Sequence, residues 1–320
     1  MVFFDMGESM KADQELNDQY DMVIIGGGPA GLTGAIYAAR GGLDVLLLER
    51  SSEGGQITVT EKIENYPGFI SVDGSELGER LTEHAKHFGA TISNKGVKNL
   101  SLCCDKKNII LDDGTQVEAK TILIATGANH RKLQVKGEKE YDGKGVSYCA
   151  ICDGAFFTDK HVAVIGGGNS AIDEGLYLTQ TAKQVTVIHR RDQLRADKIL
   201  QKRAFDNEKM DFIWDTVVEE IRGDAFVNQL LLKNKKTGEK QEYNVDGVFI
   251  YIGLVPNSKM FESLLQMTDD GFIKTDPVTF ETSMPGIYAA GDVVDKELRQ
   301  IINAAADGAT AAASAIKKYF

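Results

Sequence analysis

Short hydrophobic runs that end in glycine recur along this chain, and two of them share one form. The first run covers residues 20–25 and is followed by Gly26-Gly27-Gly28, and the second covers residues 161–165 and is followed by Gly166-Gly167-Gly168. A buried strand, a glycine turn and a helix in this order predict an α/β fold. Helices are expected directly after the two turns, at residues 32–39 and 172–179.

The pattern after each glycine turn also repeats, which indicates two copies of one architecture. In both copies, short segments that alternate between polar and apolar residues lead to an apolar strand that ends in glycine. This order is explained by a dinucleotide-binding βαβ unit that carries an antiparallel β-meander. The expected strands are residues 97–104, 108–111, 116–118 and 121–127 in the first copy, and residues 212–221, 226–233, 241–243 and 247–253 in the second.

A third apolar strand, at residues 286–291, has no fingerprint of its own and precedes an alanine-rich helical segment that begins near Asn303. It therefore completes the first domain. We predict two Rossmann-like, three-layer domains, with the second inserted into the first. Residues 1–19 are polar and acidic and are expected to form a disordered extension. The first domain would comprise residues 20–126 and 255–320, and the second would comprise residues 127–254.

Each glycine turn has the spacing of a dinucleotide-binding fingerprint. The first glycine allows the tight turn from strand to helix, and the second lets the backbone approach a pyrophosphate. A small third residue lets helix and strand pack closely, and the phosphates then lie at a helix N-terminus, where free N–H groups and the helix dipole favour negative charge. The three positions are Gly26, Gly28 and Gly31 in the first domain and Gly166, Gly168 and Ala171 in the second.

The residues at the end of the following strand distinguish the two nucleotides. In the first domain Glu49 lies about 20 residues after the glycine turn, where a carboxylate can bind a ribose 2′-hydroxyl. The equivalent place in the second domain holds His189, followed by Arg190, Arg191 and Arg195. An acid there would repel a 2′-phosphate, whereas arginines bind one through paired hydrogen bonds. We therefore expect FAD in the first domain and NADPH in the second. The alternative for the arginines is a solvated basic face.

Cys149 and Cys152 are separated by two residues and lie shortly before the second glycine turn. Together with two nucleotide sites, the pair predicts electron transfer from NADPH through FAD to a redox-active disulfide. Asp153 follows directly, and a carboxyl whose pKa is raised by burial can protonate a leaving thiolate. The alternative is half of a zinc site, but the only nearby candidate ligands are two histidines at no characteristic spacing, so no metal is expected.

Composition narrows the partners and the compartment. Of the 320 residues, 42% are hydrophobic and 26% are charged, as in ordinary globular proteins. A net charge of −11 argues against nucleic acid or an anionic membrane as a partner, and no apolar run has the length of a membrane span. With four cysteines and no signal peptide at the N-terminus, we expect a reducing, cytoplasmic compartment. Cys103 and Cys104 are expected to be structural thiols.

These motifs together resemble the bacterial-type, low-molecular-weight thioredoxin reductases, and they occur in that family's order. The resemblance implies a homodimeric flavoenzyme that uses NADPH to reduce the disulfide of thioredoxin. It also implies that Cys152 faces the flavin, that Cys149 attacks thioredoxin, and that the inserted domain rotates between the two half-reactions. The matching segments are residues 26–31, 54–56, 64–68, 125–127, 149–154, 166–171, 189–195, 291–292 and 299–300.

The same resemblance, taken residue by residue, implies a wider set of cofactor contacts. Asp292 would bind the ribityl chain, and the segment from Arg299 to Ile301 would lie beside the isoalloxazine ring. The set expected for FAD is Gly26, Gly28, Pro29, Ala30, Gly31, Glu49, Arg50, Gly55, Gln56, Asn65, Thr126, Gly127, Gly291, Asp292, Arg299, Gln300 and Ile301. The set expected for NADPH is Gly166, Gly168, Asn169, Ser170, Ala171, His189, Arg190, Arg191 and Arg195.

Three other functions are open on the sequence alone. A related reductase would serve a peroxiredoxin system or another small dithiol protein, but that type carries additional N-terminal thioredoxin-like domains, and only 19 residues precede the first strand. A flavin dithiol oxidase or a ferredoxin-driven reductase on the same fold would lack the arginines that suit NADPH. A flavoprotein-shaped binding module without chemistry would not need both cysteines. NADPH oxidation in the presence of a disulfide reagent, with and without candidate thioredoxins, discriminates between these functions.

Overall fold

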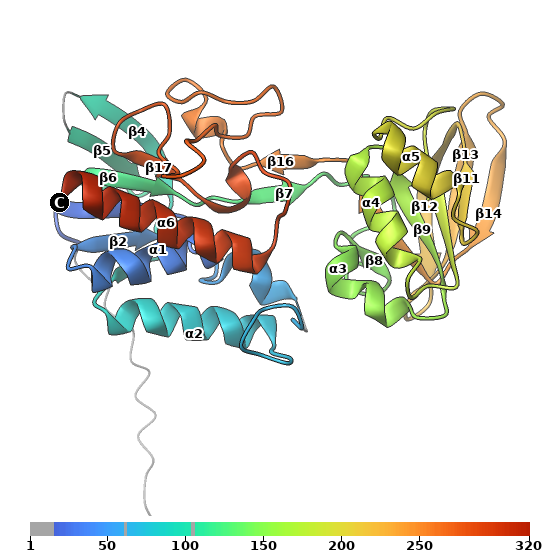
Figure 1. Cartoon of the computed structure of the whole chain (residues 1–320), viewed down its shortest axis with the longest axis horizontal. Helices are drawn as coiled ribbons and strands as arrows, with labels where there is room; N and C mark the ends of the chain where they lie inside the picture. The colour runs from blue at the N-terminus through green and yellow to red at the C-terminus, as the bar shows by residue number, and fades with distance from the viewer. Residues whose placement is uncertain (1–15, 61–62, 104–105) are drawn as a thin grey trace, which may run out of the picture. The chain divides into compact units, whose positions relative to one another are not determined.

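The computed structural model describes residues 16–60, 63–103 and 106–320, and these form two compact units (Figure 1). Unit 1 contains the described residues up to Ala128 together with Pro256–Phe320, and unit 2 is Asn129–Val255. Both units combine parallel strands with helices, so the α/β class predicted from the sequence is confirmed. Most of the expected N-terminal extension, residues 1–15, lies outside the described residues.

Unit 1 is built on a mixed seven-stranded sheet in the order β3-β2-β1-β6-β5-β4, with β17 also paired to β6. The central strand β1 runs parallel to β2 on one side and to β6 on the other, and Ile24 pairs with Leu47 and with Leu123. The β4–β5 hairpin extends the sheet in antiparallel fashion. The strands are β1 (Gln19–Ile25), β2 (Val45–Leu48), β3 (Thr91–Ser93), β4 (Val97–Cys103), β5 (Lys106–Leu111), β6 (Gln116–Ile124) and β17 (Ile287–Ala289).

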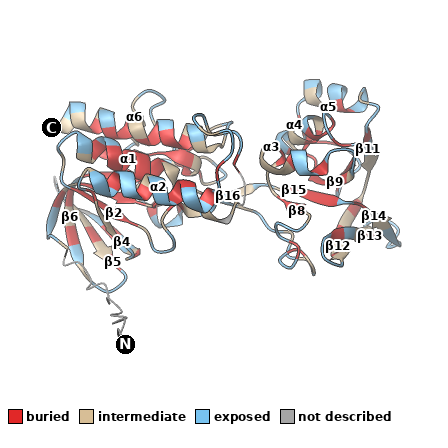
Figure 2. Ribbon diagram, turned by 90° about the horizontal axis from the view of Figure 1, so that it is seen from below, coloured by how far each residue is buried: buried red, intermediate tan, exposed pale blue. Residues whose placement is uncertain are grey.

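Helices cover one face of this sheet, and the residues buried beneath them form a continuous core (Figures 1 and 2). The first and last helices pack closely, because Gly308 in α6 faces the backbone of Ala30 in α1. On the other face, Phe261, Ile273 and Val293 pack against the strands. The α-helices are α1 (Pro29–Arg40), α2 (Gly74–His87) and α6 (Ile301–Tyr319), and the 3-10 helices are η1 (Gly55–Val59), η3 (Lys259–Phe261) and η4 (Gly291–Val293).

Unit 2 has a five-stranded parallel sheet in the order β11-β10-β9-β15-β8. The helices of the unit pack on one face, and an antiparallel sheet in the order β12-β13-β14 packs on the other. The strands are β8 (Val146–Ser147), β9 (His161–Gly166), β10 (Gln184–Ile188), β11 (Met210–Ile213), β12 (Thr216–Gly223), β13 (Val227–Asn234), β14 (Lys240–Asn244) and β15 (Gly247–Tyr251). The helices are α3 (Ala150–Asp153), η2 (Gly154–Phe157), α4 (Asn169–Leu178) and α5 (Lys198–Phe205).

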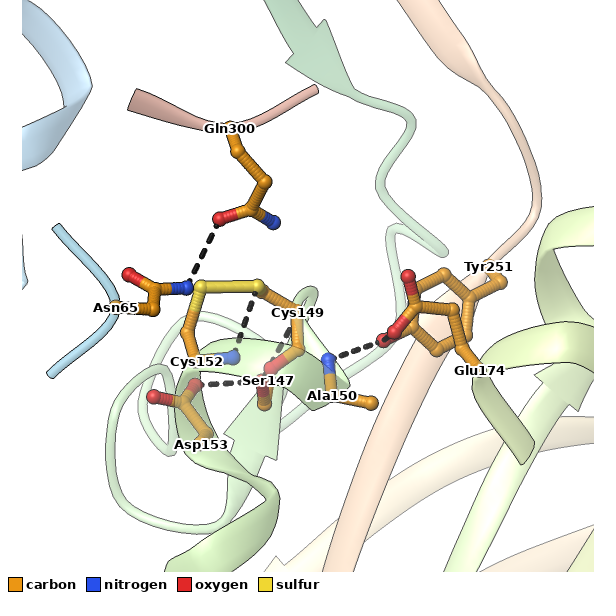
Figure 3. The surroundings of a disulfide bond; sticks show 9 residues. All are labelled: Asn65, Ser147, Cys149, Ala150, Cys152, Asp153, Glu174, Tyr251 and Gln300. Carbon is orange, nitrogen blue, oxygen red and sulfur yellow. Dashed lines mark hydrogen bonds between the residues drawn. A yellow bond between two sulfur atoms is a disulfide. The ribbon is translucent and has the colours of Figure 1, made fainter. Parts of the chain in front are cut away.

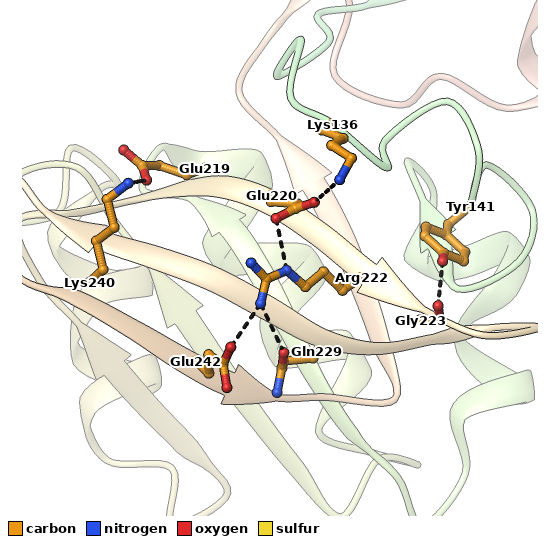
Figure 4. Close-up of polar contacts among 9 residues, drawn as sticks. All are labelled: Lys136, Tyr141, Glu219, Glu220, Arg222, Gly223, Gln229, Lys240 and Glu242. Carbon is orange, nitrogen blue, oxygen red and sulfur yellow. Dashed lines mark hydrogen bonds and ion pairs between the residues drawn. The ribbon is translucent and has the colours of Figure 1, made fainter.

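Ion pairs and one tyrosine attach the antiparallel sheet of unit 2 to the segment that precedes β8 (Figure 4). Glu220 accepts hydrogen bonds from Lys136 at 2.6 Å and from Arg222 at 2.8 Å, and Arg222 also binds Glu242 at 2.8 Å. The Tyr141 hydroxyl donates to the Gly223 carbonyl at 2.6 Å. These contacts hold together elements that are distant in sequence.

Two short strands lie where the chain passes between the units. β7 (Ala128–His130) pairs with β16 (Leu254–Pro256), and the Arg131 N–H donates to the Gly253 carbonyl at 2.9 Å. Gly253 has φ +118°, a conformation that side chains rarely adopt. The backbone conformation at this crossing therefore explains why a glycine stands at position 253.

Two strand predictions were wrong, and each error has a local cause. Residues 212–221 form two strands, β11 and β12, in different sheets, because Asp215 has φ +52° and its N–H binds the Arg191 carbonyl at 3.1 Å. Residues 116–118 and 121–127 were expected as two strands, but β6 is continuous to Ile124. Ala119, in the expected gap, pairs with both Tyr20 and Lys107.

The helices after the glycine turns begin about one turn earlier than expected, at Pro29 and Asn169. The preceding residues, Gly28 and Gly168, are extended and serve as N-caps. Proline at the first helical position lacks only an N–H that would be unpaired there, so it starts α1 without cost. The glycine fingerprint therefore ends directly at a helix N-terminus in both units.

Candidate active site

Cys149 and Cys152 form a disulfide at the start of α3, in unit 2 (Figure 3). Their Cα atoms are 5.3 Å apart, and both residues are half-buried. The Cys152 N–H points at the Cys149 sulfur at 3.2 Å, so that sulfur occupies the N-cap position of the helical turn. A donor in this place stabilises negative charge on Cys149 more than on Cys152, which favours a Cys149 thiolate in the reduced pair.

Asp153 lies beside the disulfide and is bound by a serine that the sequence analysis missed. The Ser147 hydroxyl donates to Asp153 Oδ2 at 2.6 Å and accepts the Cys149 N–H at 3.1 Å (Figure 3). Burial raises the pKa of Asp153, the Ser147 hydrogen bond lowers it, and the charge of Asp142 raises it. The net shift is upward, so the protonated form persists to higher pH than for an exposed aspartate. This carboxyl can therefore deliver a proton to a neighbouring sulfur.

A second acid, Glu174, and a tyrosine, Tyr251, lie near the helical turn that carries the disulfide, and neither belongs to a sequence motif. The Ala150 N–H donates to the Tyr251 hydroxyl at 2.6 Å, and that hydroxyl donates to Glu174 Oε2 at 3.4 Å (Figure 3). Burial raises the pKa of Glu174 and of Tyr251. Strands and helices distant in sequence bring these residues together, so no local motif contains them.

The first glycine turn, in unit 1, has the close approaches that its spacing predicts. Gly26 has φ +108°, and a Cβ atom there would lie 2.3 Å from the Ala125 carbonyl oxygen. A Cβ atom on Gly31 would lie 1.8 Å from the Gly26 carbonyl oxygen, so strand and helix can meet only without side chains. No atom lies within 4 Å of the equivalent point on Gly28, which leaves its backbone approachable. Glu49 accepts the Gly27 N–H at 2.7 Å and so lies at this turn.

The second glycine turn, in unit 2, repeats this geometry with a basic surrounding. A Cβ atom on Gly166 would lie 2.4 Å from the Tyr251 carbonyl oxygen. The imidazole of His189 packs against Gly167, where an added Cβ would lie 2.4 Å from Nδ1. Asn169 accepts the Asp197 N–H at 2.8 Å and donates to its carboxylate at 2.9 Å. Gly168 is open within 4 Å, as Gly28 is.

The arginines predicted for this site lie around the same histidine. Burial lowers the pKa of His189, and the charges of Arg195, Arg191 and Arg190 lower it further. All three arginines are exposed, and the Arg195 N–H donates to the Gly167 carbonyl at 2.7 Å. The histidine is therefore neutral while the positive charge stays on the guanidinium groups, at the edge of the glycine turn.

Several further residues that the sequence analysis assigned to FAD are brought together within unit 1. The Asn65 side-chain amide donates to Gln300 Oε1 at 3.1 Å, although the two residues are far apart in sequence. The Gln56 amide donates to the Ala128 carbonyl. The Thr126 hydroxyl donates to the Asn257 carbonyl at 2.8 Å, which places Thr126 beside a residue that the sequence analysis did not select.

Four buried polar atoms in unit 1 have no hydrogen-bond partner among the described residues, and two of them, Asp292 Oδ1 and Arg299 Nε, belong to residues expected to contact FAD. Burial raises the pKa of Asp292, and the charges of Lys296 and Arg299 lower it. The Arg299 guanidinium lies over the Phe272 ring, 4.5 Å from its centroid. Buried groups without partners are costly, so these two atoms mark a place that suits a polar ligand.

Three other predictions from the sequence concern a metal site, a membrane-spanning segment, and the two cysteines outside the disulfide. Within the part of the chain that the structure describes, no group of three His, Cys, Asp or Glu residues is arranged to hold a metal ion. A search of the same residues finds no helix with the length and apolar character needed to cross a membrane. Cys104 lies outside the described residues, and the Cys103 side chain is likewise not described.

Comparisons with known proteins agree with this arrangement. The sequence matches the family described as pyridine nucleotide-disulphide oxidoreductase over residues 20–308. The thioredoxin reductase of Bacillus subtilis (strain 168) is 49% identical over 296 residues, which cover 92% of this chain and 93% of that protein. The thioredoxin reductase of Listeria innocua is 49% identical over 299 residues, which cover 93% of both chains. The crystal structure of thioredoxin reductase from Streptococcus pyogenes MGAS5005 matches with a TM-score of 0.88 and 48% identity, and the match covers 95% of this chain and all of that one.

The chain therefore belongs to the pyridine nucleotide-disulphide oxidoreductase family, and within it to the bacterial-type thioredoxin reductases. It is an oxidoreductase, and the family resemblance found from the sequence motifs alone is confirmed.

Proposed function

We propose that this chain uses NADPH, through bound FAD and the Cys149–Cys152 disulfide, to reduce the disulfide of thioredoxin. The observation that carries the proposal is the half-buried disulfide at a helix start, with the raised-pKa carboxyl of Asp153 beside it. A dithiol that reduces the disulfide of a partner protein needs a sulfur atom that the partner can reach, a stabilised thiolate and a proton donor. The relatives that match nearly the whole chain are named thioredoxin reductase, which supports thioredoxin as the substrate.

FAD fits unit 1, and the FAD-binding domain that we propose is the predicted one, residues 20–126 and 255–320. The open backbone at Gly28 suits a pyrophosphate at the N-terminus of α1, and Glu49 lies at the same turn to meet a ribose. Asp292 Oδ1 and Arg299 Nε, which have no hydrogen-bond partner among the described residues, suit a ribityl hydroxyl and the flavin ring. When bound, the flavin supplies hydride acceptance from NADPH and electron delivery to the disulfide.

NADPH fits unit 2, and the NADPH-binding domain that we propose is the predicted one, residues 127–254. The Gly168 backbone and the N-terminus of α4 suit its pyrophosphate, and Arg190, Arg191 and Arg195 suit its 2′-phosphate. These arginines are also the feature that argues against a dithiol oxidase or a ferredoxin-driven enzyme, since neither has a 2′-phosphate to bind.

The second half-reaction is a thiol–disulfide exchange. The Cys149 thiolate attacks one sulfur of the thioredoxin disulfide, and a mixed disulfide forms while the other thioredoxin sulfur leaves as a thiolate and takes up a proton. Cys152 then attacks Cys149, which reforms the Cys149–Cys152 disulfide and releases the second thioredoxin thiol. Asp153 supplies protons to the leaving thiolates and accepts them from the attacking thiols.

We further propose that the inserted domain rotates between the two half-reactions. NADPH and the redox cysteines belong to the same unit, and both must come within near-contact distance of one flavin in the other unit. If both use the same flavin face, they cannot occupy it together, and thioredoxin cannot reach Cys149 while the pair is held against the flavin. The two crossings, near residues 127–131 and 253–257, would absorb the change.

The test separates the two half-reactions. Cys149→Ser and Cys152→Ser should abolish NADPH-dependent reduction of thioredoxin while NADPH still bleaches the flavin absorbance in a stopped-flow experiment. Cys103→Ser/Cys104→Ser is the matched control, and its turnover should remain near wild type. The proposal fails if this control stops turnover while its flavin stays bound and reducible, or if wild-type enzyme oxidises NADPH with no thioredoxin-dependent rate. Activity with a peroxiredoxin-linked dithiol protein but with no thioredoxin would identify the alternative substrate.

A further inference from the structure

A buried carboxylate in the last helix contacts the segment that carries several of the proposed flavin contacts at two points, Gly291 and Lys296. Asp307 lies in α6 and is 8% exposed. Its Oδ2 accepts the Gly291 N–H at 3.1 Å, directly before Asp292, and the same oxygen binds the Lys296 ammonium. The carbonyl of Lys296 in turn accepts a hydrogen bond from Arg299 at 2.6 Å. One carboxylate thus connects to Asp292 through Gly291 and to Arg299 through Lys296.

The backbone around Asp307 is packed too tightly to adjust if this carboxylate is removed. The next residue, Gly308, faces α1, and a Cβ atom there would lie 2.0 Å from the Ala30 carbonyl oxygen. A Cβ atom on Gly291 would lie 2.9 Å from the Ala30 Cβ. The last helix, the Gly291 turn and the first turn of α1 therefore meet at Ala30. In this place, both the Gly291 N–H and the Lys296 ammonium need a buried acceptor.

We propose that Asp307 is a positioning residue for the flavin site, and that it fixes Asp292 and Arg299 through Gly291 and Lys296. This inference rests on the proposed FAD site in unit 1. Asp292 and Arg299 each have one buried polar atom without a partner among the described residues, so their placement depends on the contacts of Gly291 with Asp307 and of Arg299 with the Lys296 carbonyl. The Lys296 side chain is only 15% exposed, so loss of Asp307 would leave a nearly buried ammonium unpaired and free the turn beside it.

The chain offers a closely matched control for the variants. Glu281 accepts the Gly286 N–H at 2.9 Å and binds Lys318 of α6 at 2.6 Å, so it also joins a glycine turn and a lysine through one carboxylate. None of the proposed flavin contacts belongs to that turn. The test variants are Asp307→Asn, which keeps the shape but removes the charge, and Lys296→Met, which leaves the Asp307–Gly291 hydrogen bond in place. The control is Glu281→Gln.

Three measurements on the flavin-loaded proteins separate positioning from general stability. FAD release is followed by flavin fluorescence, the midpoint potential of the bound flavin by spectroelectrochemistry, and unfolding by thermal melting. Asp307→Asn and Lys296→Met should release FAD about tenfold to a hundredfold faster than wild type, because charge-assisted hydrogen bonds are lost. Their flavin potential should fall, because the Arg299 charge that favours the reduced ring is no longer fixed. Glu281→Gln should melt earlier but release FAD within about twofold of wild type.

The outcomes distinguish this inference from the function on which it rests. A wild-type protein that does not bind FAD would overturn both. Wild-type protein that retains FAD, with all three variants releasing it at the wild-type rate and at an unchanged potential, would overturn only the positioning role of Asp307. If Asp307→Asn does not fold, Lys296→Met decides the result by itself, since it keeps the hydrogen bond to Gly291.

Discussion

His189 is buried between a glycine turn and three exposed arginines, at the place where an acid would select NADH. Burial and the neighbouring guanidinium charges keep its pKa low, so the imidazole is neutral near pH 7. A neutral ring packs against Gly167 without repelling the arginines or attracting a counter-ion of its own. Selectivity for a 2′-phosphate should therefore come from the arginines, and His189 fills the space that a carboxylate would occupy.

Arginine substitutions should therefore separate the two nicotinamide nucleotides. Arg190→Ala or Arg191→Ala should raise the KM for NADPH far more than the KM for NADH. Loss of one charge-assisted contact costs about 1.5–3 kcal/mol, or roughly tenfold to over a hundredfold. Lys202→Ala, which removes an exposed positive charge from the nearby α5, serves as the control. Equal effects of the arginine variants on both nucleotides would show that the cluster does not bind the 2′-phosphate.

The proton-donor role proposed for Asp153, together with its raised pKa, predicts a pH dependence for the disulfide half-reaction. The charge of Asp142 helps to raise this pKa, so Asp142→Asn should lower it. The protonated form would then be lost at lower pH, and the alkaline limb of thioredoxin reduction should move to lower pH. Asp153→Asn should slow this half-reaction by about 10²- to 10⁴-fold and remove the limb, while flavin reduction by NADPH stays normal. If the limb of Asp142→Asn coincides with that of wild type, Asp153 does not control it.

At the scale of elements, the sequence predicted best what depends on neighbouring residues. The two glycine fingerprints, their strands and the cysteine pair are local patterns, and each was found close to its observed place. Asp307 was missed because folding brings it to Gly291 and Lys296, which are more than ten residues away. Ser147 lies within six residues of Cys149 and Asp153 but was missed because a single serine carries no periodic signal. Asp215 was missed because a left-handed aspartate within an apolar run looks like part of one strand. Such positions require the tertiary structure.

The contact between α1 and α6 gives a prediction for helix glycines. Gly308→Ala should lower the free energy of unfolding by about 1–3 kcal/mol, because the new Cβ would lie 2.0 Å from the Ala30 carbonyl oxygen and the helices must move apart. Gly175→Ala in α4 is the matched control. There the closest atom to the new Cβ is the flexible end of Met210, at 3.2 Å, and the other neighbours are at ordinary contact distance, so the helix propensity of alanine should leave stability equal to or above wild type. Denaturant unfolding of both variants checks this, and equal losses would contradict the packing argument.

At the scale of the whole molecule, the chain crosses twice between its two units, and both crossings contain a glycine with positive φ. Gly127 has φ +68° and accepts the Asn257 N–H at 2.9 Å, and Gly253 has φ +118° and accepts the Arg131 N–H at 2.9 Å. Each crossing is thus a short stretch of hydrogen-bonded residues and not a long linker. Such residues can absorb a rotation through small φ/ψ changes while each unit keeps its own core.

The proposed rotation predicts that a covalent link between the units blocks turnover without destroying either half-reaction. One exposed cysteine is introduced into each unit in a Cys103→Ser/Cys104→Ser background, and a bismaleimide joins them while the Cys149–Cys152 pair is oxidised. Each linked enzyme should retain either flavin reduction by NADPH or electron exchange between flavin and the cysteine pair, depending on the positions joined, because only one group can reach the flavin. Continuous thioredoxin reduction should be lost. The same cysteines capped with a monofunctional maleimide should turn over normally, which separates the link from the chemical modification. A set of links at different positions that all left thioredoxin reduction at the full rate would exclude the rotation.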